Sequence, residues 1–567
     1  MSKYVIGLDY GTNSCRSLLI DVANGKELAS HVFPYPSGSS GVIVDGNDPN
    51  LARQNPADYV NGIEVTICEA LKKAKAVDPL FSPSNVIGIG VDTTGSSPLP
   101  VDADGLPLCF NEKFKNNPAA MVWLWKDHTS FAEAAQITAL ASNIRPQFLS
   151  KIGGTYSSEW WWSKILHCKN IAPEVFDAAS SWIEICDWIP AVLTGELKPQ
   201  NIKRSVCAAG HKAMFHPEWN GLPDEEFLEK LSPGLGSLRS RLFDQTFTAE
   251  HLAGYLSKEW AAKLGLSTSV AIAVGAFDAH MGAVGAGIST GTLVKIVGTS
   301  TCDIMIHPHK KPLQDIPGVC GIVDGSVMKG YYGIEAGQSG VGDIFLWFVN
   351  NLVSEKYGAT QDEKFQNLGA AAAELQPGES GLLALDWNNG NRTILVDVRL
   401  TGLLLGQTLH TTAPEIYRAL IEATGFGALA IIDRIEEYGV PVKEVVNCGG
   451  LAIKNQLMMQ IYADIVGRPM KISRSEQTPA LGAGIFAAVA AGTNSGGYGS
   501  VDDARSAMTG MGKVYSPDQK NHEIYKKLYK LYRQLHDSFG MKSWHGEMFT
   551  VMKELLAIRD GAKKAKQ

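Results

Sequence analysis

A carboxylate, a guanidinium and several hydroxyl and amide groups lie within eight residues near the N-terminus. The segment runs from Asp9 to Arg16 through Gly11, Thr12 and Asn13, and it directly follows an apolar β-branched run. This composition is typical of a tight hairpin whose backbone N–H groups can hold an oxyanion. Asp9 could attract Mg²⁺ through its water shell, and Arg16 could offset charge on a transferred phosphoryl group. Taken alone, however, an ordinary hairpin turn explains the segment better.

A second segment of the same kind lies far along the chain. An apolar run again ends at Gly298 and Thr299, which small hydroxyl residues follow. Two such loops indicate two related lobes that grip a polyphosphate between them, and the repetition makes the ordinary-turn interpretation much less favoured. We therefore predict ATP contacts at Gly11, Thr12, Asn13, Arg16, Gly298 and Thr299.

A glycine pair adds weaker evidence for a nucleotide. Gly449 and Gly450 lie between a predicted strand, residues 442–447, and a predicted helix that begins at Asn455. Glycine lets the backbone pass close to a flat ring or its ribose, although a plain strand-to-helix turn uses the same residues. The chain has no Gly-x-x-x-x-Gly-Lys-Ser/Thr loop and no clean Gly-x-Gly-x-x-Gly that opens a helix, which excludes the two commonest nucleotide folds.

Size and composition favour a two-lobed enzyme with a small substrate. The chain has 567 residues, of which 45% are hydrophobic and 19% charged, several times the usual domain of about 100–200 residues. A net charge of -7 gives no reason to expect nucleic acid or an anionic membrane as partner. We find no membrane span and no signal peptide, so we expect a cytoplasmic protein. The sequence leaves open whether the chain forms a homodimer.

Alternating strands and helices predict α/β layers in both halves. A strand hairpin over residues 4–21, a covering helix after Asn55 and a buried strand at 86–92 begin the first half. The second half repeats this order, with a capping box at Thr412 that opens a helix. The small residues at 275–287 suit close packing at a junction, so we divide the chain into lobes 1–285 and 286–567. We expect a frayed C-terminal tail, and nine scattered cysteines as reduced thiols.

The two hairpins and the glycine pair resemble, in order and spacing, the FGGY family of carbohydrate kinases. The likeness is most specific in the strings at 90–96, 124–129, 156–160, 209–212 and 275–287, and these favour the branch that phosphorylates L-ribulose. The resemblance implies a two-lobed, actin-like ATPase fold of the ribonuclease H-like type, with the active site in a cleft between the lobes. It implies a sugar-binding N-terminal lobe, a nucleotide-binding C-terminal lobe, and ATP with Mg²⁺.

The resemblance also implies a reaction and a base. Asp278 would accept the proton of the sugar's terminal hydroxyl as that oxygen attacks the γ-phosphorus of ATP, yielding L-ribulose 5-phosphate in L-arabinose catabolism. The alternative is an aspartate that only caps the helix after it, and both can hold together. We expect this carboxylate to stay ionised because it lies at a helix N-terminus.

Further residues follow from the same likeness. Asn455, Gly449 and Gly450 would contact ATP, and Asp9 would serve the metal. The sugar's hydroxyls and ketone need polar groups against an apolar wall. The implied sugar ligands are Thr94, Gly95, Ser96, Trp125, Asp127, Lys212, Asp278 and Glu335, with one ring of Trp160, Trp161 and Trp162 stacked on the sugar. A lone lysine is more often a solvated surface group, but Lys212 lies among small residues that could bring it inward.

Two alternatives remain. The same chemistry could act on D-ribulose, xylulose or L-fuculose; a glycerol-like substrate is disfavoured, because Thr94-Gly95 stands where many family members carry a charged pair. The other is an actin-like ATPase switch, in which Asp278, Lys212 and the string at 125–127 would have no evident role.

Overall fold

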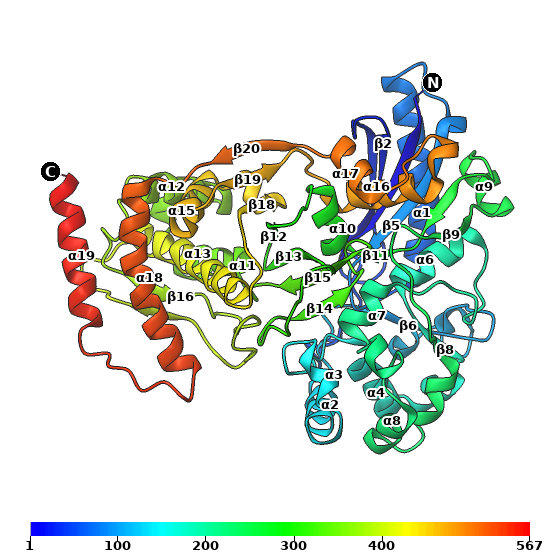
Figure 1. Cartoon of the computed structure of the whole chain (residues 1–567), viewed down its shortest axis with the longest axis horizontal. Helices are drawn as coiled ribbons and strands as arrows, with labels where there is room; N and C mark the ends of the chain where they lie inside the picture. The colour runs from blue at the N-terminus through cyan, green and yellow to red at the C-terminus, as the bar shows by residue number, and fades with distance from the viewer. Residues whose placement is uncertain (1, 567) are drawn as a thin grey trace.

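The computed structural model describes residues 2–566 and shows two lobes, each built on a seven-stranded sheet (Figure 1). The strand order of the first sheet is β3-β2-β1-β5-β10-β9, with β11 paired to β5. Its strands are β1 (Tyr4–Tyr10), β2 (Ser14–Asp21), β3 (Glu27–Pro34), β5 (Val86–Thr93), β9 (Leu252–Tyr255), β10 (Ala271–Ala273) and β11 (Ala276–Phe277).

The second sheet repeats this plan. Its order is β14-β15-β13-β12-β18-β19-β20, so an antiparallel hairpin again adjoins parallel strands. The strands are β12 (Thr292–Val297), β13 (Thr301–Pro308), β14 (Gly321–Asp324), β15 (Tyr331–Ala336), β18 (Glu444–Cys448), β19 (Met470–Ser473) and β20 (Met511–Tyr515). Both predicted hairpins and the predicted α/β layering are confirmed.

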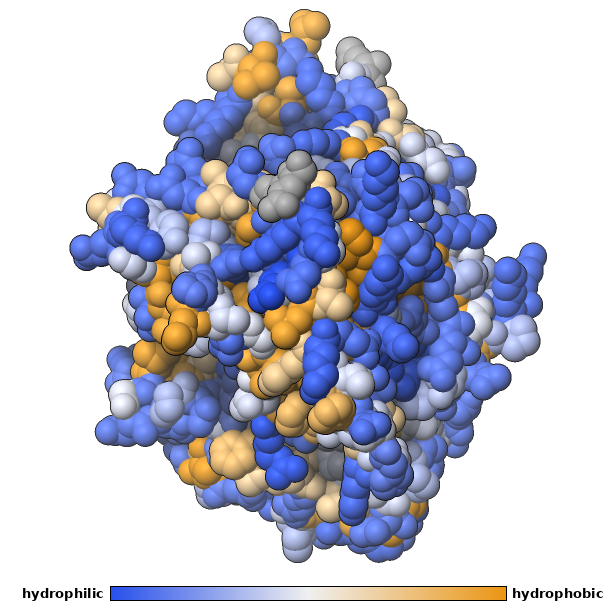
Figure 2. Space-filling view, turned by 90° about the vertical axis from the view of Figure 1, so that its left-hand side faces the viewer, coloured by the Kyte–Doolittle hydropathy of each residue, from blue (hydrophilic) through white to orange (hydrophobic). Residues whose placement is uncertain are grey.

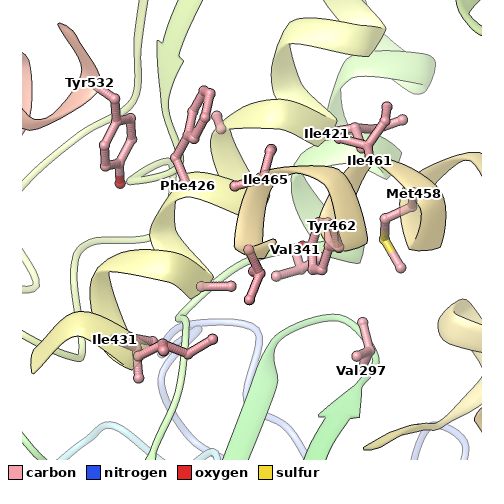
Figure 3. Close-up of a cluster of buried hydrophobic side chains, with 14 of the residues drawn as sticks. Val297, Val341, Ile421, Phe426, Ile431, Met458, Ile461, Tyr462, Ile465 and Tyr532 are labelled. Atoms are coloured by element: carbon pink, nitrogen blue, oxygen red, sulfur yellow. The ribbon is translucent and has the colours of Figure 1, made fainter. Parts of the chain in front are cut away.

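Helices cover the faces of both sheets. α1 (Pro56–Val77) begins after its cap Asn55, and its buried stripe includes Ile63 and Ile67. α13 (Ala413–Glu437) begins with the predicted capping box of Thr412 and Glu415. In the second lobe α15 (Gln456–Val466) lies near α13, and the two helices enclose an apolar core above the β12–β13 hairpin (Figure 3).

One helix from the second half of the chain packs on the sheet of the first. α16 (Thr478–Ala491) lies against β1 and β5, where a Cβ on Gly7 would come within 1.8 Å of the Ala480 carbonyl oxygen and a Cβ on Gly90 within 1.9 Å of that of Ala483. α10 (Asp278–Gly285) packs on α16 as closely, since a Cβ on Gly285 would meet the Thr478 carbonyl oxygen at 2.0 Å. These glycines allow the backbones to approach, which confirms the close packing predicted for residues 275–287.

The first lobe carries an inserted helical layer between β5 and β9. Its core contains Trp123, Trp161 and Trp182. The larger helices and short strands of this insertion are β6 (Pro98–Val101), β7 (Val122–Trp123), α2 (Phe131–Ile144), α3 (Gln147–Ser150), α4 (Trp161–Ile171), α5 (Pro173–Ala178), β8 (Ser181–Glu184), α6 (Ile185–Thr194), α7 (Val206–Lys212) and α8 (Glu225–Leu231). Outside it, β4 (Arg53–Gln54) precedes β5 and pairs with β7, and α9 (Lys258–Leu264) follows β9.

The far end of the second lobe is helical. Besides α13 and α15, the elements of the second lobe are α11 (Gly342–Leu352), α12 (Gln361–Ala373), β16 (Leu383–Leu385), β17 (Leu403–Leu405), α14 (Gly450–Lys454), α18 (Gln519–Gly540) and α19 (Val551–Lys566). α17 (Val501–Met508) instead packs against α16 beside the first sheet (Figure 1). The expected frayed tail is wrong, because α19 continues to Lys566 and buries Val551, Leu555 and Ala562. Polar side chains cover most of this end face, with apolar ones in small groups (Figure 2).

All nine cysteines are free thiols, as predicted. Within the described residues, no helix combines the length and the apolar character that a membrane crossing requires.

Candidate active site

Three aspartates meet at the carboxyl edge of the first sheet. β1 and β5 are parallel, and their register places Asp9 opposite Asp92. β11 pairs with β5 so that Ala276 faces Asp92 and Phe277 faces Thr93, which brings Asp278, the next residue, to the same edge. Ligands of open α/β sheets bind outside the carboxyl ends of such strands. The register therefore builds an acidic edge from three separate segments.

The acidic edge has little positive charge to balance it. Arg16 Nη1 lies 3.2 Å from Asp9 Oδ2. Asp92 is fully buried, and its oxygens accept no hydrogen bond from an N–H or hydroxyl donor among the described residues; they adjoin the Asp9 carboxyl group, which can hydrogen-bond to Asp92 only when one of the two is protonated. Burial, together with the charges of Asp9 and Asp278, raises the pKa of Asp92 well above its usual range. Two buried carboxylates side by side favour a shared proton or a bound cation.

Asp278 is the first residue of α10 rather than its cap, a position that Phe277 takes. Burial and the nearby Asp9 raise the pKa of Asp278 to about 7, although the Ala279 amide donates a hydrogen bond to its carboxylate. Desolvation thus works against the ionisation that the helix N-terminus was expected to favour. A carboxyl with a pKa near neutrality suits a general base.

Two side chains from other segments hold the first hairpin turn by donating hydrogen bonds to its carbonyl and hydroxyl oxygens. Gln54 Nε2 donates to the Thr12 carbonyl oxygen at 2.7 Å, and Trp125 Nε1 donates to Thr12 Oγ1 at 3.0 Å. Both donors reach the turn because β4 pairs with β7, which ends just before Trp125. The backbone N–H of Thr12 has no hydrogen-bond partner within residues 2–566. It is therefore available to a phosphate oxygen.

The second turn is held in a comparable way. The first amides of α11 and the residue before it donate to the Gly298 and Thr299 carbonyls at 2.8–3.1 Å. Gly342 allows this approach, because a Cβ there would lie 2.6 Å from the Gly298 carbonyl oxygen. No partner for the Thr299 N–H is found in the described part of the chain. The two turns thus present similar free amides.

The glycine pair has the backbone shape that close approach requires. Gly449 has a φ of 92°, and a Cβ on it would lie 2.5 Å from the Val297 carbonyl oxygen. A Cβ on Gly450 would meet nothing within 4 Å. Asn455 caps α15, since its Oδ1 accepts from the Met458 amide at 3.0 Å. Gly450 therefore borders open space beside the second turn.

A buried ion pair joins the two lobes. Lys212 Nζ, at the end of α7, donates to Glu335 Oε1 on β15 at 2.8 Å. Burial alone would raise the pKa of Glu335, but Lys212 outweighs it and holds that pKa well below its usual range. Burial likewise opposes the charge of Lys212, whose pKa is nevertheless raised by Glu335. Lys212 also lies 5.2 Å from the centroid of the ring of Trp160, one of the three tryptophans of which a single ring was predicted to stack on the sugar.

The segment Thr94–Ser96 forms a rigid turn after β5. Ser96 Oγ donates to Glu184, and Lys164 Nζ donates to the Ser96 carbonyl oxygen at 2.7 Å. Gly95 lies against the Phe277 ring, which a Cβ on it would meet at 2.0 Å. This packing places the turn beside Asp278.

Asp127 is held apart from these groups. Its fully buried carboxylate pairs with Arg53 and accepts hydrogen bonds from the Ala52 amide at 2.7 Å and Thr129 Oγ1 at 2.6 Å. The other predicted residues fall into the clusters already described.

Sequence reasoning missed three residues of this region: Asp92, His211 and His280. Asp92 ends a strand beside Asp9, and the parallel register was the signal that could have found it. His211 and His280 contact each other and Glu335. The sequence gives no sign of this contact, because it joins three segments that are distant in the chain.

Comparison with known proteins places the chain among sugar kinases. The N-terminal domain of the FGGY family of carbohydrate kinases matches residues 4–285, and the C-terminal domain of the same family matches residues 293–491. The chain belongs to the FGGY family of carbohydrate kinases. It is accordingly an ATP-dependent carbohydrate kinase, as the sequence predicted.

Relatives in this family match the chain from end to end. It is 43% identical to a ribulokinase of Geobacillus thermodenitrificans, over 100% of this chain and 99% of that protein. A ribulokinase of Mycolicibacterium smegmatis is 39% identical over 99% of this chain and 97% of the relative. In structure, the xylulose kinase of Lactobacillus acidophilus superposes with a TM-score of 0.76 at 22% identity, covering 95% of this chain and 99% of that one. This confirms the predicted two-lobed, actin-like fold.

Proposed function

We propose that this kinase transfers the γ-phosphoryl group of ATP to the terminal hydroxyl of L-ribulose, giving L-ribulose 5-phosphate for L-arabinose catabolism. The observation that carries the proposal is the position of Asp278 at the acidic edge, within electrostatic reach of the Lys212–Glu335 pair that spans the lobes. Relatives named ribulokinase, similar along the whole chain, favour a ribulose over other ketoses.

The transfer needs a base beside the sugar and donors around the phosphates. The free amides of the two turns, with Gly449 and Gly450 beside them, would hold the nucleotide. Asp278 accepts the proton of the terminal hydroxyl while that oxygen forms a bond to the γ-phosphorus, and the bond from phosphorus to ADP breaks. A pKa of about 7 lets Asp278 take this proton and release it again near neutral pH.

The acidic edge fits Mg²⁺. Asp9 and Asp92 supply oxygen donors, which this ion prefers, and the buried oxygens of Asp92 accept no hydrogen bond from an N–H or hydroxyl donor among the described residues. Asp9 would hold the ion through its water shell, with Asp92 behind it. When bound, Mg²⁺ would neutralise charge on the phosphates.

The remaining residues divide between the two lobes as the family resemblance implies. In lobe 1–285, Lys212, the turn Thr94–Ser96 and Trp160 would bind the sugar, joined by Glu335 from lobe 286–567. Trp125 and Asp127 would act indirectly, because Trp125 holds Thr12 and Asp127 holds Arg53. Asn455 would support the nucleotide site as the cap of α15. Free thiols and the need for ATP favour the cytoplasm as the place of action.

The test is ADP formation measured with each of L-ribulose, D-ribulose, D-xylulose, L-xylulose and L-fuculose, and without sugar. The proposal expects the highest kcat/KM with L-ribulose and a 5-phosphate product in the phosphorus NMR spectrum. A clear preference for xylulose would assign the enzyme to another ketose. ATP hydrolysis that no ketose stimulates would favour the ATPase switch and overturn the proposal.

A further inference from the structure

Two buried histidines lie next to the Lys212–Glu335 pair and have no role in the phosphoryl transfer as proposed. His211 directly precedes Lys212 on α7, and His280 lies two residues after Asp278 on α10. Both side chains are at most 2% exposed. Buried imidazoles satisfy their nitrogens within the protein, so the contacts of these rings are informative.

The ring nitrogens form a continuous line of contacts from α10 to Glu335. His280 Nε2 lies 3.0 Å from His211 Nε2. His211 Nδ1 lies 3.3 Å from Glu335 Oε2, while Glu335 Oε1 accepts from Lys212 Nζ. Neither His211 Nδ1 nor Glu335 Oε2 has a well-aligned hydrogen bond within the described chain, so the two atoms meet at ion-pair distance only. His280 Nε2 lies 3.8 Å from the same carboxylate oxygen, so both rings adjoin Glu335.

These contacts determine where the protons lie. A carboxylate only accepts hydrogen bonds, so His211 Nδ1 carries the proton that faces Glu335. His211 Nε2 is then an acceptor, to which His280 Nε2 donates, and the Ser326 hydroxyl lies 3.0 Å from the same nitrogen as a second possible donor. Burial holds the pKa of His211 well below its usual range and lowers the pKa of His280 to about 4. Each ring therefore carries a single proton at neutral pH.

On the basis of the proposed function, we propose that His211 and His280 are positioning residues that orient the Glu335 carboxylate toward the sugar. Their line of polar contacts joins α7, α10 and β15. It thereby couples a sugar ligand of the second lobe to the helix that begins with the base Asp278. A divalent metal held by the same three side chains is disfavoured, because the Lys212 ammonium already pairs with Glu335 and would repel a second cation.

The packing around His211 offers a way to disturb the line without changing any of its members. Gly321 on β14 lies against the ring, and a Cβ there would come within 2.2 Å of His211 Nδ1. Gly321 is not among the glycines with positive φ, so alanine fits its backbone. Gly321→Ala should displace the imidazole from Glu335 and reproduce the effect of removing it.

The first test separates orientation from folding. His211→Leu and His280→Leu should raise KM for the ketose, by about 10- to 100-fold for His211→Leu, which removes a polar contact with a buried charged group. KM for ATP should stay unchanged and kcat should fall much less. His211→Asn keeps a donor in place of Nδ1 and should restore KM, whereas His211→Gln should not. At position 280 the opposite is expected: His280→Gln should restore KM for the ketose, whereas His280→Asn should not.

A matched control is His307→Gln. His307 is 4% exposed on β13 and makes no contact with the line. Its replacement should alter thermal stability without raising KM for the ketose. The proposal is wrong if the ketose KM of every histidine variant, including His307→Gln, rises in proportion to its loss of thermal stability. The histidines would then have only a structural role.

The second test does not depend on activity. Nitrogen NMR of histidine side chains in the sugar-free enzyme should show His211 protonated at Nδ1 and His280 at Nε2, assigned with the single variants. The opposite protonation would overturn the proposal, as would Zn²⁺ binding at one ion per chain that is lost in His280→Gln. If no ketose is phosphorylated while the protonation is as expected, the proposed function fails and the line of polar contacts still stands.

Discussion

At equivalent strand positions, the first lobe pairs Asp9 with Asp92, whereas the second pairs Ile296 with Cys448. In both lobes the first residue of the pair lies two positions before the glycine of the hairpin turn. The second turn accordingly rests on apolar packing, with Val297 beneath α13 and α15 (Figure 3). The same pair of strand positions thus carries two carboxyl groups in the first lobe and two uncharged side chains, which support the turn by packing, in the second.

The helices that follow the sheets show the same contrast. α10 begins Asp278-Ala279-His280-Met281-Gly282, and α16 begins Thr478-Pro479-Ala480-Leu481-Gly482. The two helices pack on each other through these glycines. The aspartate and histidine of α10 correspond to threonine and alanine in α16. The start of α10 therefore carries the side chain proposed as the base, whereas the start of α16 repeats its backbone without an acidic or basic side chain.

Removal of the base should have the largest effect. Asp278→Asn should lower kcat by about 10²- to 10⁴-fold, because the amide cannot accept the hydroxyl proton. ATP affinity, measured by calorimetry, should stay the same. The matched change at the start of α16, Thr478→Ala, should reduce kcat far less. An equal loss of kcat in Asp278→Asn and Thr478→Ala would contradict the proposed difference between the two lobes.

The second prediction concerns the acidic pair. Asp92→Asn should raise the Mg²⁺ concentration for half-maximal activity by about 10- to 100-fold, as the loss of a group near a metal does. In metal-free buffer the same variant should melt at a higher temperature than the parent, because a buried carboxylate without an N–H or hydroxyl donor in the described chain is removed. The counterpart Cys448→Ala should leave the Mg²⁺ dependence unchanged. An unaltered Mg²⁺ dependence in Asp92→Asn would exclude Asp92 from the metal site.

The pH dependence should show the raised pKa of Asp278. Below its pKa of about 7 the carboxyl is protonated and cannot accept a proton, so kcat/KM for the ketose should fall about 10-fold per pH unit on the acid side. Above pH 7 the base is ionised and the profile should level off. A profile that stays flat down to pH 5 would show that the base has an ordinary pKa.

The smallest effect should come from the glycine pair. Gly449→Ala places a Cβ against the Val297 carbonyl at a positive φ, which should raise KM for ATP several-fold through local strain of about 1–3 kcal/mol. Gly450→Ala enters open space and should be close to neutral for folding. Equal thermal stability of the two variants would contradict this difference.

The sequence predicted those features that short segments encode. Both hairpins were visible because glycine and hydroxyl residues interrupt apolar runs, and α13 was visible because Thr412 and Glu415 form a capping box. α19 was missed because its lysine-rich end hides the buried spacing of Val551 and Leu555. Local signals of this kind identify elements without placing them.

The site was predictable only in part, because its decisive contacts join distant segments. Asp9 was found from its own neighbours in sequence and Lys212 from the family resemblance, but Asp92 gains its significance from strand register alone. The ion pair of Asp127 with Arg53 needs two strands that the sequence does not visibly connect. The raised pKa of Asp278 likewise depends on burial, which helix position alone did not reveal.

The most direct test of this account is a crystal structure with L-ribulose and a non-hydrolysable ATP analogue. The account predicts phosphate oxygens at the amides of Thr12 and Thr299, and the terminal hydroxyl of the sugar within hydrogen-bond distance of Asp278. A nucleotide bound away from either turn, or a different sugar hydroxyl facing Asp278, would contradict it.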